Sequence, residues 1–431
     1  MTTAGGMTAA VCVDVGSTYT KACRVDLGTG EMTGRAEVPT TSASDVLAGL
    51  DAAVAAVGGS SGQPLYVCSS AGGGLRLAVI GYESLVTAEA GHRVGLSAGA
   101  QVVHVAAGRL DGRAVALVRG SRPDVLLLVG GTDGGDAGTL LHNARRLATS
   151  RLRVPVVVAG NADARPAAAA ILQERDLPVT VTSNVLPRIG VLDPGPARAA
   201  IRDVFLRHVI GGKRLSRGRR FASLVRAATP DAVLAGVELL ADLTAAGVLV
   251  VDVGGATTDV YSALLPDAEL AHGPRRDVAG TLWRSRTVEG DLGVAAGAAG
   301  TVAAATAEKL TPKLARPETG RPPTAESDRE LAAAAAVIAL RRHARGHSPG
   351  PGLPRTGGRD LRDVRLVVGS GGVLRHGGGR YVLDRVLADV AGGWAAPAAA
   401  RTVVDQRYVL AAAGLLAADH PGAAARLLNS L

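Results

Sequence analysis

Apolar runs of strand length open the chain and are followed by a segment with helical spacing. The runs at residues 9–15, 20–27 and 31–38 are separated by short turns, which predicts three antiparallel strands. Apolar residues then recur with the period of a helix over residues 46–57, and another apolar run follows at residues 65–68. The predicted opening order is therefore strand, strand, strand, helix, strand.

The middle of the chain alternates between strand-like and helix-like segments. Residues 125–129 and 154–158 are apolar runs that end in glycine-containing turns, and residues 139–148 between them have helical spacing. Helices are also predicted near residues 87–98 and 196–210. This alternation predicts a mostly parallel sheet.

The last section begins with a helix, for which Thr229 is the candidate N-cap and Pro230 the first helical residue. Strands are predicted at residues 248–253 and 365–368, and a terminal helix at about 408–418.

Three of the predicted strands end in turns rich in glycine or in both glycine and hydroxyl groups. The segments are VCVDVGSTYTK at residues 11–21, VLVVDVGGATTDV at 248–260 and RLVVGSGGV at 365–373. Glycine lets the backbone approach an anion closely, and amide and hydroxyl groups can then donate to phosphate oxygens. The candidate nucleotide-binding residues are Gly16, Ser17, Thr18, Lys21, Gly254, Gly255, Thr257, Thr258, Asp259, Gly369, Ser370, Gly371 and Gly372.

An aspartate stands at the end of each of the first two strands. Asp14 and Asp252 would repel a bare phosphate, so their positions predict an intervening Mg²⁺, held mostly through water. We therefore expect ATP with Mg²⁺ as the ligand, and we expect both aspartates to organise the metal and the attacking water. The third turn has no acid, and its glycines would allow flat contact with a base or ribose.

Almost all of the positively charged residues in this chain are arginines. Only four of the 47 Lys+Arg residues are lysines, and Lys21 is the only lysine before residue 213. Lys21 closes the first turn, where a compact ammonium suits a phosphate cluster. An outward strand residue is the equally weighted alternative.

Composition changes the functional prediction little. The net charge of +9 is spread over scattered arginines and the aromatic content is 2%, which argues against a nucleic-acid partner. The cysteines are an odd three without a C-x-x-C pair, which fits a reducing cytoplasm. We expect no signal peptide and no membrane span, because no basic n-region and no apolar run of about 20 residues is present.

The three turns resemble the phosphate 1, phosphate 2 and adenosine motifs of the actin, sugar kinase and heat-shock ATPase superfamily. Within it, the chain resembles the glutamate mutase L proteins, also called the MutL family, over nearly its whole length. The stretches that carry this resemblance are DVGSTYTKACRVD (14–26), TAEAGHR (87–93), LLLVGGTDGGD (126–136), VVVAGNADA (156–164), SNVLPRIGVLDPGPAR (183–198), VVDVGGATTDVYS (250–262), RTVEGDLG (286–293) and VGSGGVLRH (368–376).

This resemblance implies an α/β fold with two ribonuclease-H-like halves, ATP in the cleft between them and an α/β section inserted between the halves. On this basis residues 1–110 form the first half, residues 111–228 the inserted section and residues 229–431 the second half, with a Pro/Gly-rich insertion at about 311–360. The implied function is an accessory ATPase that reactivates an adenosylcobalamin-dependent carbon-skeleton mutase, with mutase subunits as partners.

Two other functions stay open at this stage: a small-molecule kinase of the same superfamily, and a nucleotide-binding scaffold without useful turnover. The GGTDGGD turn at residues 130–136 bears on the first of these. Leu128 stands where the phosphate 2 motif has its aspartate, so we expect a structural turn there. A ligand-contacting loop is the alternative, with Asp133 or Asp136 as the general base of a kinase.

Overall fold

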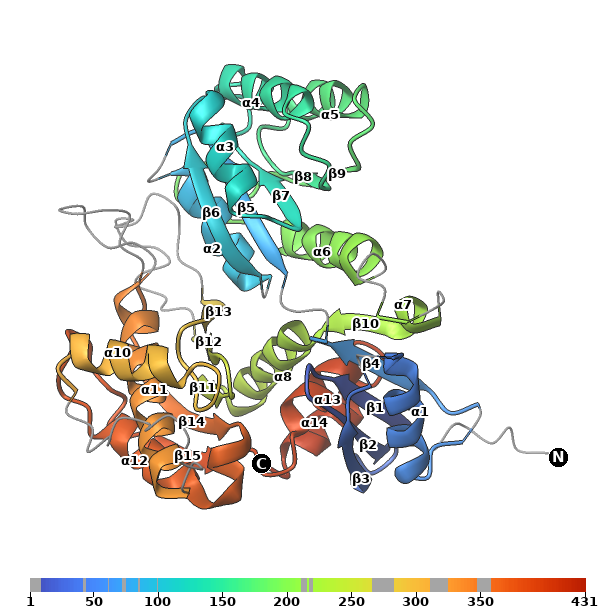
Figure 1. The fold of residues 1–431 in the computed structure, drawn as a ribbon, viewed down its shortest axis with the longest axis vertical. Coiled ribbons are helices and arrows are strands. Elements are labelled where there is room, and N and C mark those ends of the chain that lie inside the picture. The colour runs from blue at the N-terminus through green and yellow to red at the C-terminus, as the bar shows by residue number, and fades with distance from the viewer. Residues whose placement is uncertain are drawn as a thin grey trace. The chain divides into compact units, whose positions relative to one another are not determined.

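The computed structural model describes residues 9–41, 44–60, 62–71, 75–83, 86–98, 100–210, 215–216, 220–265, 283–310, 325–346 and 358–431. About half of the predicted Pro/Gly-rich insertion, residues 311–324 and 347–357, lies outside these residues. The described chain contains three five-stranded sheets with helices packed on them, which confirms the predicted α/β class (Figure 1). It divides into two compact units. The first runs to Val233 and adds Ala411–Leu427; the second comprises Leu234–Leu265, Trp283–Leu410 and Leu428–Leu431.

The first sheet lies in the first unit and has the order β10-β4-β1-β2-β3. Its strands are β1 (Ala9–Val15), β2 (Tyr19–Asp26), β3 (Met32–Pro39), β4 (Leu65–Ser69) and β10 (Val225–Ala228). The first three strands are antiparallel neighbours, whereas β4 runs parallel to β1 and β10 runs parallel to β4.

Alternation along β1 sends its side chains to two different helices. Val11, Val13 and Val15 pack in one apolar cluster with residues of α1 (Val46–Ala56). Cys12 points to the other face, where its thiol lies 3.9 Å from the carbonyl oxygen of Ala412 in α13 (Val409–Leu416). Helices thus cover both faces of the sheet. The carboxyl end of the central strand β1 leads into the turn before β2.

The second sheet lies in the second unit and repeats the strand order and directions of the first. Its order is β13-β12-β11-β14-β15, which corresponds to the first sheet read in the direction β3-β2-β1-β4-β10. The strands are β11 (Gly247–Val253), β12 (Thr258–Ala263), β13 (Arg284–Glu289), β14 (Val364–Ser370) and β15 (Arg401–Val404). Leu249, Val251 and Val253 pack against α11 (Ala325–Arg345) and α12 (Gly379–Leu387). The apolar face of α11 is mostly alanine, so this long helix lies close to the sheet.

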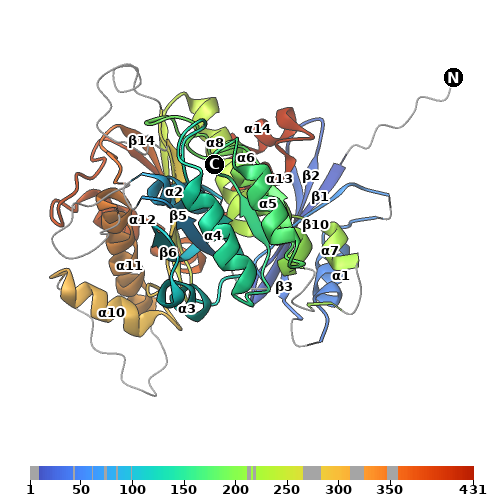
Figure 2. The same ribbon diagram turned by 90° about the horizontal axis from the view of Figure 1, so that it is seen from above.

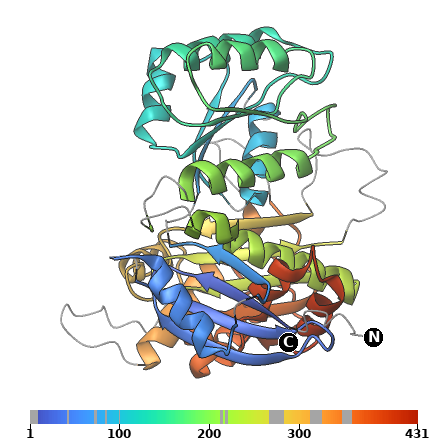
Figure 3. The same cartoon turned by 90° about the vertical axis from the view of Figure 1, so that its right-hand side faces the viewer.

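The third sheet is fully parallel and has the order β6-β5-β7-β8-β9. Its strands are β5 (Arg76–Gly81), β6 (Gln101–Ala107), β7 (Val125–Leu128), β8 (Val156–Val158) and β9 (Val179–Val181). Helices α3 (Gly112–Gly120), α4 (Gly138–Thr149) and α5 (Arg165–Gln173) cover one face; α2 (Thr87–Ser97) and α6 (Gly195–Val204) cover the other. Figure 2 shows α4 and α5 side by side, and Figure 3 shows helices on both sides of the sheet.

Strand periodicity explains this double covering. Ala78, Ile80 and Leu126 belong to the cluster under α3, α4 and α5, whereas Leu77 and Val79 belong to the cluster with α2 and α6. Both sets are buried, which is why these strands are continuous apolar runs rather than alternating ones.

The observed sheets divide the chain at different residues from the predicted boundaries. β5, α2 and β6 fall within predicted residues 1–110 but belong to the third sheet, which therefore begins at Arg76 rather than at residue 111. β10 falls within predicted residues 111–228 but closes the first sheet beside β4. The physical reason is that a buried apolar run does not encode which sheet it joins, since that choice depends on partners far away in sequence.

The remaining helices are short, apart from α8. They are η1 (Phe205–Ile210), α7 (Arg220–Leu224), α8 (Thr229–Thr244), α10 (Ala298–Ala307), η2 (Leu374–Gly378) and α14 (Pro421–Leu428). None of the helices in the described part of the chain has both the length and the apolar character needed to cross a bilayer.

Candidate functional site

The phosphate 1 turn joins β1 to β2 in the first unit and is closed by short backbone contacts. The Gly16 amide donates to the Tyr19 carbonyl at 3.0 Å, and a Cβ at position 16 would lie 2.7 Å from that carbonyl oxygen. Glycine is therefore required here by the tightness of the turn. Ser17 and Thr18 at its tip are exposed.

The carbonyl groups of this turn are held from behind by Thr40. Its hydroxyl donates to the Gly16 carbonyl at 2.9 Å, and its amide donates to the Thr18 carbonyl at 2.8 Å. In a planar trans peptide the carbonyl and the following N–H point in opposite directions. The amides of Ser17 and Tyr19 are thus directed away from Thr40, as an anion-binding turn requires.

Asp14 is oriented by two neighbours at the end of β1. The Thr229 hydroxyl donates to Asp14 Oδ1 at 2.5 Å, and the Cys68 thiol lies 3.6 Å from the same oxygen. Burial and the Asp14 carboxylate raise the pKa of the Cys68 thiol, so the thiol keeps its proton. The prediction of Thr229 as N-cap and Pro230 as first helical residue is shifted by one residue, because α8 begins at Thr229 itself, and the Thr229 hydroxyl is directed to Asp14.

Lys21 lies directly opposite Asp14 in the β1–β2 ladder. Residues that pair in this way point to the same face of an antiparallel sheet, so the ammonium and the carboxylate share a face. Glu37 of β3 pairs with Lys21 on its other side. This arrangement brings together the predicted phosphate 1 residues Asp14 and Lys21.

The phosphate 2 turn joins β11 to β12 in the second unit, and its carbonyl groups are likewise held from behind by hydrogen bonds. The Gly254 carbonyl accepts from the Val294 amide at 3.1 Å, and the Gly255 carbonyl accepts from the amides of Ala295 at 2.8 Å and Gly297 at 3.1 Å. The amides of Gly255 and Ala256 therefore point away from this support, toward the exposed side of the turn. Two successive outward amides form a concave donor site for an anion.

Two residues predicted to bind nucleotide in this motif are engaged by the fold instead. Thr258 is fully buried, and its hydroxyl donates to the Leu292 carbonyl at 3.1 Å. Its only hydroxyl proton is therefore directed into the protein, which corrects the prediction that it donates to phosphate. Asp259 forms an ion pair with Arg286 at 3.0 Å. Thr257 keeps a partly exposed side chain.

Asp252 lies between two other predicted residues at the end of β11. It pairs with Asp259 across the antiparallel ladder and with Ser370 of the adenosine motif across the parallel ladder. The phosphate 2 and adenosine motifs thus occupy the same edge of one sheet. Arg286 offsets the repulsion expected between two carboxylates that face each other on neighbouring strands.

The glycines of the adenosine motif have different roles. A Cβ at Gly369 would lie 2.6 Å from a methyl carbon of Leu374, so this glycine serves packing. Gly371 has a φ of +103° and lies against the Val253 carbonyl, where a Cβ would be 2.1 Å from the oxygen. Around Gly372, by contrast, nothing lies within 4 Å of a Cβ position. Of these three glycines, Gly372 is the one whose lack of a side chain is not explained by packing within the protein.

These residues fit a magnesium nucleotide. Among the described residues no group of three or more His, Cys, Asp or Glu side chains could hold a metal ion by itself. Mg²⁺ commonly binds through one or two carboxylates, several waters and the phosphates of its nucleotide, so single carboxylates such as Asp14 and Asp252 suit it.

The GGTDGGD turn follows β7 in the third sheet, and its two aspartates accept hydrogen bonds within the fold. Asp133 accepts from the Ala162 amide at 2.8 Å and from the side-chain amide of Asn184 at 2.9 Å. Asp136 accepts from the amides of Gly138 and Thr139 at the start of α4. These contacts support the structural interpretation of the turn.

Sequence reasoning missed Thr229 as a partner of Asp14, and it missed the segment that supports the phosphate 2 turn. Glycines at positions 293, 297 and 300 are the one signal that could have found the second feature, because their spacing allows close backbone contact.

Family comparison agrees with the resemblance seen in the motifs. A model of the MutL protein family matches residues 10–431. The chain belongs to the MutL protein family. Protein MutL of Clostridium tetanomorphum is 34% identical over 459 residues, which cover 98% of this chain and 99% of that protein. The predicted membership in the glutamate mutase L family is therefore confirmed.

Solved structures show more distant similarity. ATP-dependent caprolactamase from Pseudomonas jessenii is 13% identical with a TM-score of 0.39, over 95% of this chain and 71% of that one. Xylulose kinase from Bifidobacterium adolescentis is 12% identical with a TM-score of 0.34, over 99% and 94%. Component A of (R)-2-hydroxyglutaryl-CoA dehydratase from Acidaminococcus fermentans is 10% identical with a TM-score of 0.33, over 96% and 99%.

Proposed function

We propose that this protein is an ATP-binding accessory ATPase that reactivates an adenosylcobalamin-dependent carbon-skeleton mutase of the glutamate mutase type. Membership in the MutL family supports the choice of partner. The observation that carries the choice of ligand is the phosphate 2 turn, whose two outward amides follow β11, the strand with Asp252 as its next-to-last residue. Three free, buried cysteines support a cytoplasmic location.

Each motif has a distinct task in this proposal. Asp14 and Asp252 would hold Mg²⁺ through water, and the amides of Ser17, Gly255 and Ala256 would bind phosphate oxygens. Bound Mg²⁺ would neutralise negative charge on the phosphates. Lys21 would add a point charge to the phosphate 1 turn, and the open space at Gly372 would admit the base or ribose.

The proposed cycle depends on nucleotide state. ATP and ADP would stabilise different conformations of the protein, and each conformation would bind the mutase with a different affinity. This difference would drive release of an inactive cobalamin from the mutase, so that an intact one can enter. Asp133 and Asp136, the candidate bases of the kinase alternative, accept hydrogen bonds in loop and helix contacts, and these contacts favour a structural role for them.

The test combines a binding measurement with a mutase assay. Calorimetry with ATP, with and without Mg²⁺, compares the wild type with Asp252→Asn and with Asp384→Asn, an exposed acid on α12, as the control. We expect Asp252→Asn to abolish the gain in ATP affinity that Mg²⁺ provides, and the control to keep it. We also expect wild-type protein with ATP to restore activity to a mutase carrying damaged cobalamin.

Two results would count against this function. Absence of ATP binding by the wild type would remove the nucleotide part of the proposal. ATP binding without any effect on the damaged mutase would leave a nucleotide-binding scaffold instead.

A further inference from the structure

The phosphate 2 turn is held by one continuous segment that follows β13. This segment, residues 291–297, supplies the three amides that bind the carbonyls of Gly254 and Gly255. It also receives the Thr258 hydroxyl through the Leu292 carbonyl. Four hydrogen bonds therefore fix the turn to this segment, and the outward direction of the turn's amides depends on them.

Close glycine contacts leave this segment little freedom. A Cβ at Gly293 would lie 2.6 Å from the Gly255 carbonyl oxygen, and one at Gly297 would lie 2.5 Å from the Ala256 carbonyl oxygen. Behind them the Thr301 hydroxyl bridges the Gly293 amide and carbonyl at 2.8 and 2.9 Å. A displacement of the segment would therefore be transmitted to the turn rather than absorbed.

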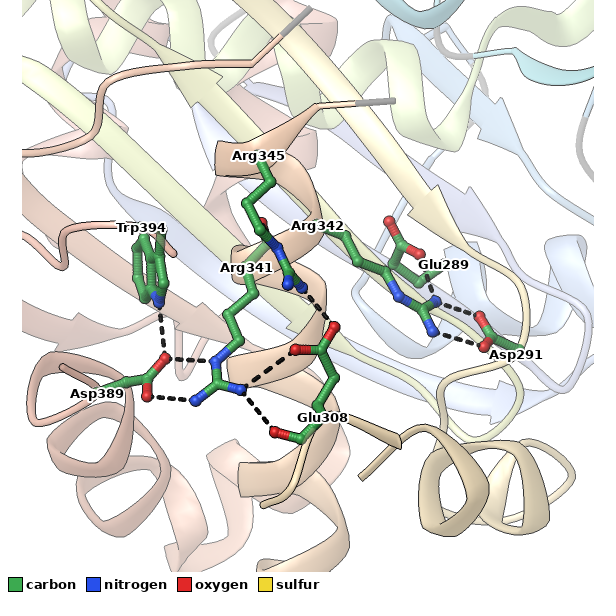
Figure 4. Close-up of polar contacts among 8 residues, drawn as sticks. All are labelled: Glu289, Asp291, Glu308, Arg341, Arg342, Arg345, Asp389 and Trp394. Atoms are coloured by element: carbon green, nitrogen blue, oxygen red, sulfur yellow. Dashed lines mark hydrogen bonds and ion pairs between the residues drawn. The ribbon is translucent and has the colours of Figure 1, made fainter. Parts of the chain in front are cut away.

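One side chain from another helix anchors the beginning of this segment. Arg342, in the last turn of α11, donates from Nη1 to Glu289 at 2.8 Å and to Asp291 at 2.7 Å, and from Nη2 to Asp291 at 3.0 Å (Figure 4). The contact with Asp291 is bidentate, which fixes direction as well as distance. The Arg342 guanidinium holds the pKa of Asp291 below its usual value, so the pair stays ionised near neutral pH.

The neighbouring arginines of α11 pair with acids that lie outside β13 and the segment at residues 291–297. Arg341 is buried and binds Asp389 through two hydrogen bonds, while Trp394 donates to the same carboxylate. Arg345 pairs with Glu308, just beyond the end of α10. Figure 4 shows that Arg342 alone among the three labelled arginines reaches Glu289 and Asp291.

We propose that Arg342 is a positioning residue for nucleotide, which couples α11 to the phosphate 2 turn through Glu289, Asp291 and the segment at residues 291–297. This inference rests on the proposed ATP binding at that turn. The new element is the role of α11. A shift of this helix would change the direction of the turn's amides, and a change in the turn would in return shift the helix.

The experiment compares Arg342→Ala with Arg345→Ala, a matched control that removes the same charge and an ion pair from the same helix. Mg²⁺–ATP affinity is measured by calorimetry, thermal unfolding by calorimetric scanning, and amide exchange over residues 254–258 by mass spectrometry. We expect Arg342→Ala to weaken ATP binding by roughly tenfold and to speed exchange in the turn, and the control to change affinity by less than about twofold.

Two conservative variants keep the test informative if Arg342→Ala folds poorly. Arg342→Lys retains the charge but loses the bidentate contact, and Asp291→Asn retains an acceptor but loses the ion pair. Both should weaken ATP binding in the same direction and by a smaller factor. Arg342→Lys should recover part of the affinity lost in Arg342→Ala.

The outcomes separate this proposal from the one on which it depends. Equal effects of Arg342→Ala and Arg345→Ala on ATP affinity, or unchanged affinity in Arg342→Ala with a lower unfolding temperature, would overturn the positioning role and leave a structural one. If wild-type protein does not bind ATP at all, the proposed function itself fails.

Discussion

Adjacent glycines of the adenosine motif allow stability and nucleotide binding to be tested one residue apart. Gly371→Ala places a methyl group at φ +103°, 2.1 Å from the Val253 carbonyl oxygen. A non-glycine residue in such a backbone region costs about 1–3 kcal/mol, and forcing an extra methyl into a packed position costs about 1–3 kcal/mol more. We therefore expect destabilisation of about 2–6 kcal/mol.

Gly372→Ala makes the same chemical change where nothing lies within 4 Å of the new methyl group. The backbone there is outside the left-handed region, so alanine is tolerated and stability should change by less than about 1 kcal/mol. If a base or ribose occupies the open space, however, the methyl group will obstruct it. We expect weaker ATP binding with an unchanged unfolding temperature.

Thermal unfolding with and without Mg²⁺–ATP measures both effects together. A ligand at a hundred times its Kd stabilises the folded state by about 2.7 kcal/mol. Wild type should show this shift, and Gly372→Ala should lose most of it. Gly371→Ala should unfold at a temperature lower by on the order of 5 °C or more without ligand. A full ATP shift in Gly372→Ala, or a normal unfolding temperature for Gly371→Ala, would refute the reasoning.

Three further predictions concern single side chains. Thr229→Val removes the hydroxyl that donates to Asp14 and should lower ATP turnover by roughly tenfold in a steady-state assay, whereas Thr229→Ser should retain most of it. Thr258→Val should cost about 1–2 kcal/mol in denaturant unfolding through the lost bond to Leu292, with ATP affinity unchanged; a large loss of affinity would restore its predicted role. Burial lowers the pKa of His343 well below 6.5, so the folded protein keeps it neutral while the unfolded chain takes up a proton. Stability should therefore fall as the pH decreases below 6.5, and His343→Gln should remove part of that dependence in pH-resolved unfolding.

The sequence was most informative where chemistry follows directly from a strand end. Asp14, Asp252 and the glycines after them were identifiable because an apolar strand followed by an acid and small residues is a local pattern. The membership of β5, β6 and β10 was not identifiable, because their partners are chosen by distant contacts. The same limit applies to side chains.

Thr258 and Thr257 illustrate this limit. In sequence they are equivalent hydroxyls in one turn, yet only Thr258 points inward, to a carbonyl 34 residues away. Arg342 likewise has no local sequence signature, since α11 presents three arginines within five residues and only the fold directs Arg342 to Glu289 and Asp291 while the other two share Glu308.

The order in which the chain is synthesised has a consequence for the first sheet. β10 is separated from its neighbour β4 by the whole third sheet, so the edge of β4 stays open until residue 228 has been made. Ala412 and Asp419, which contact Cys12 and Tyr66, arrive later still. Apolar surface on the earliest strands is therefore exposed during almost the entire translation of the chain. We therefore expect the nascent protein to bind general chaperones and to aggregate when it is overproduced.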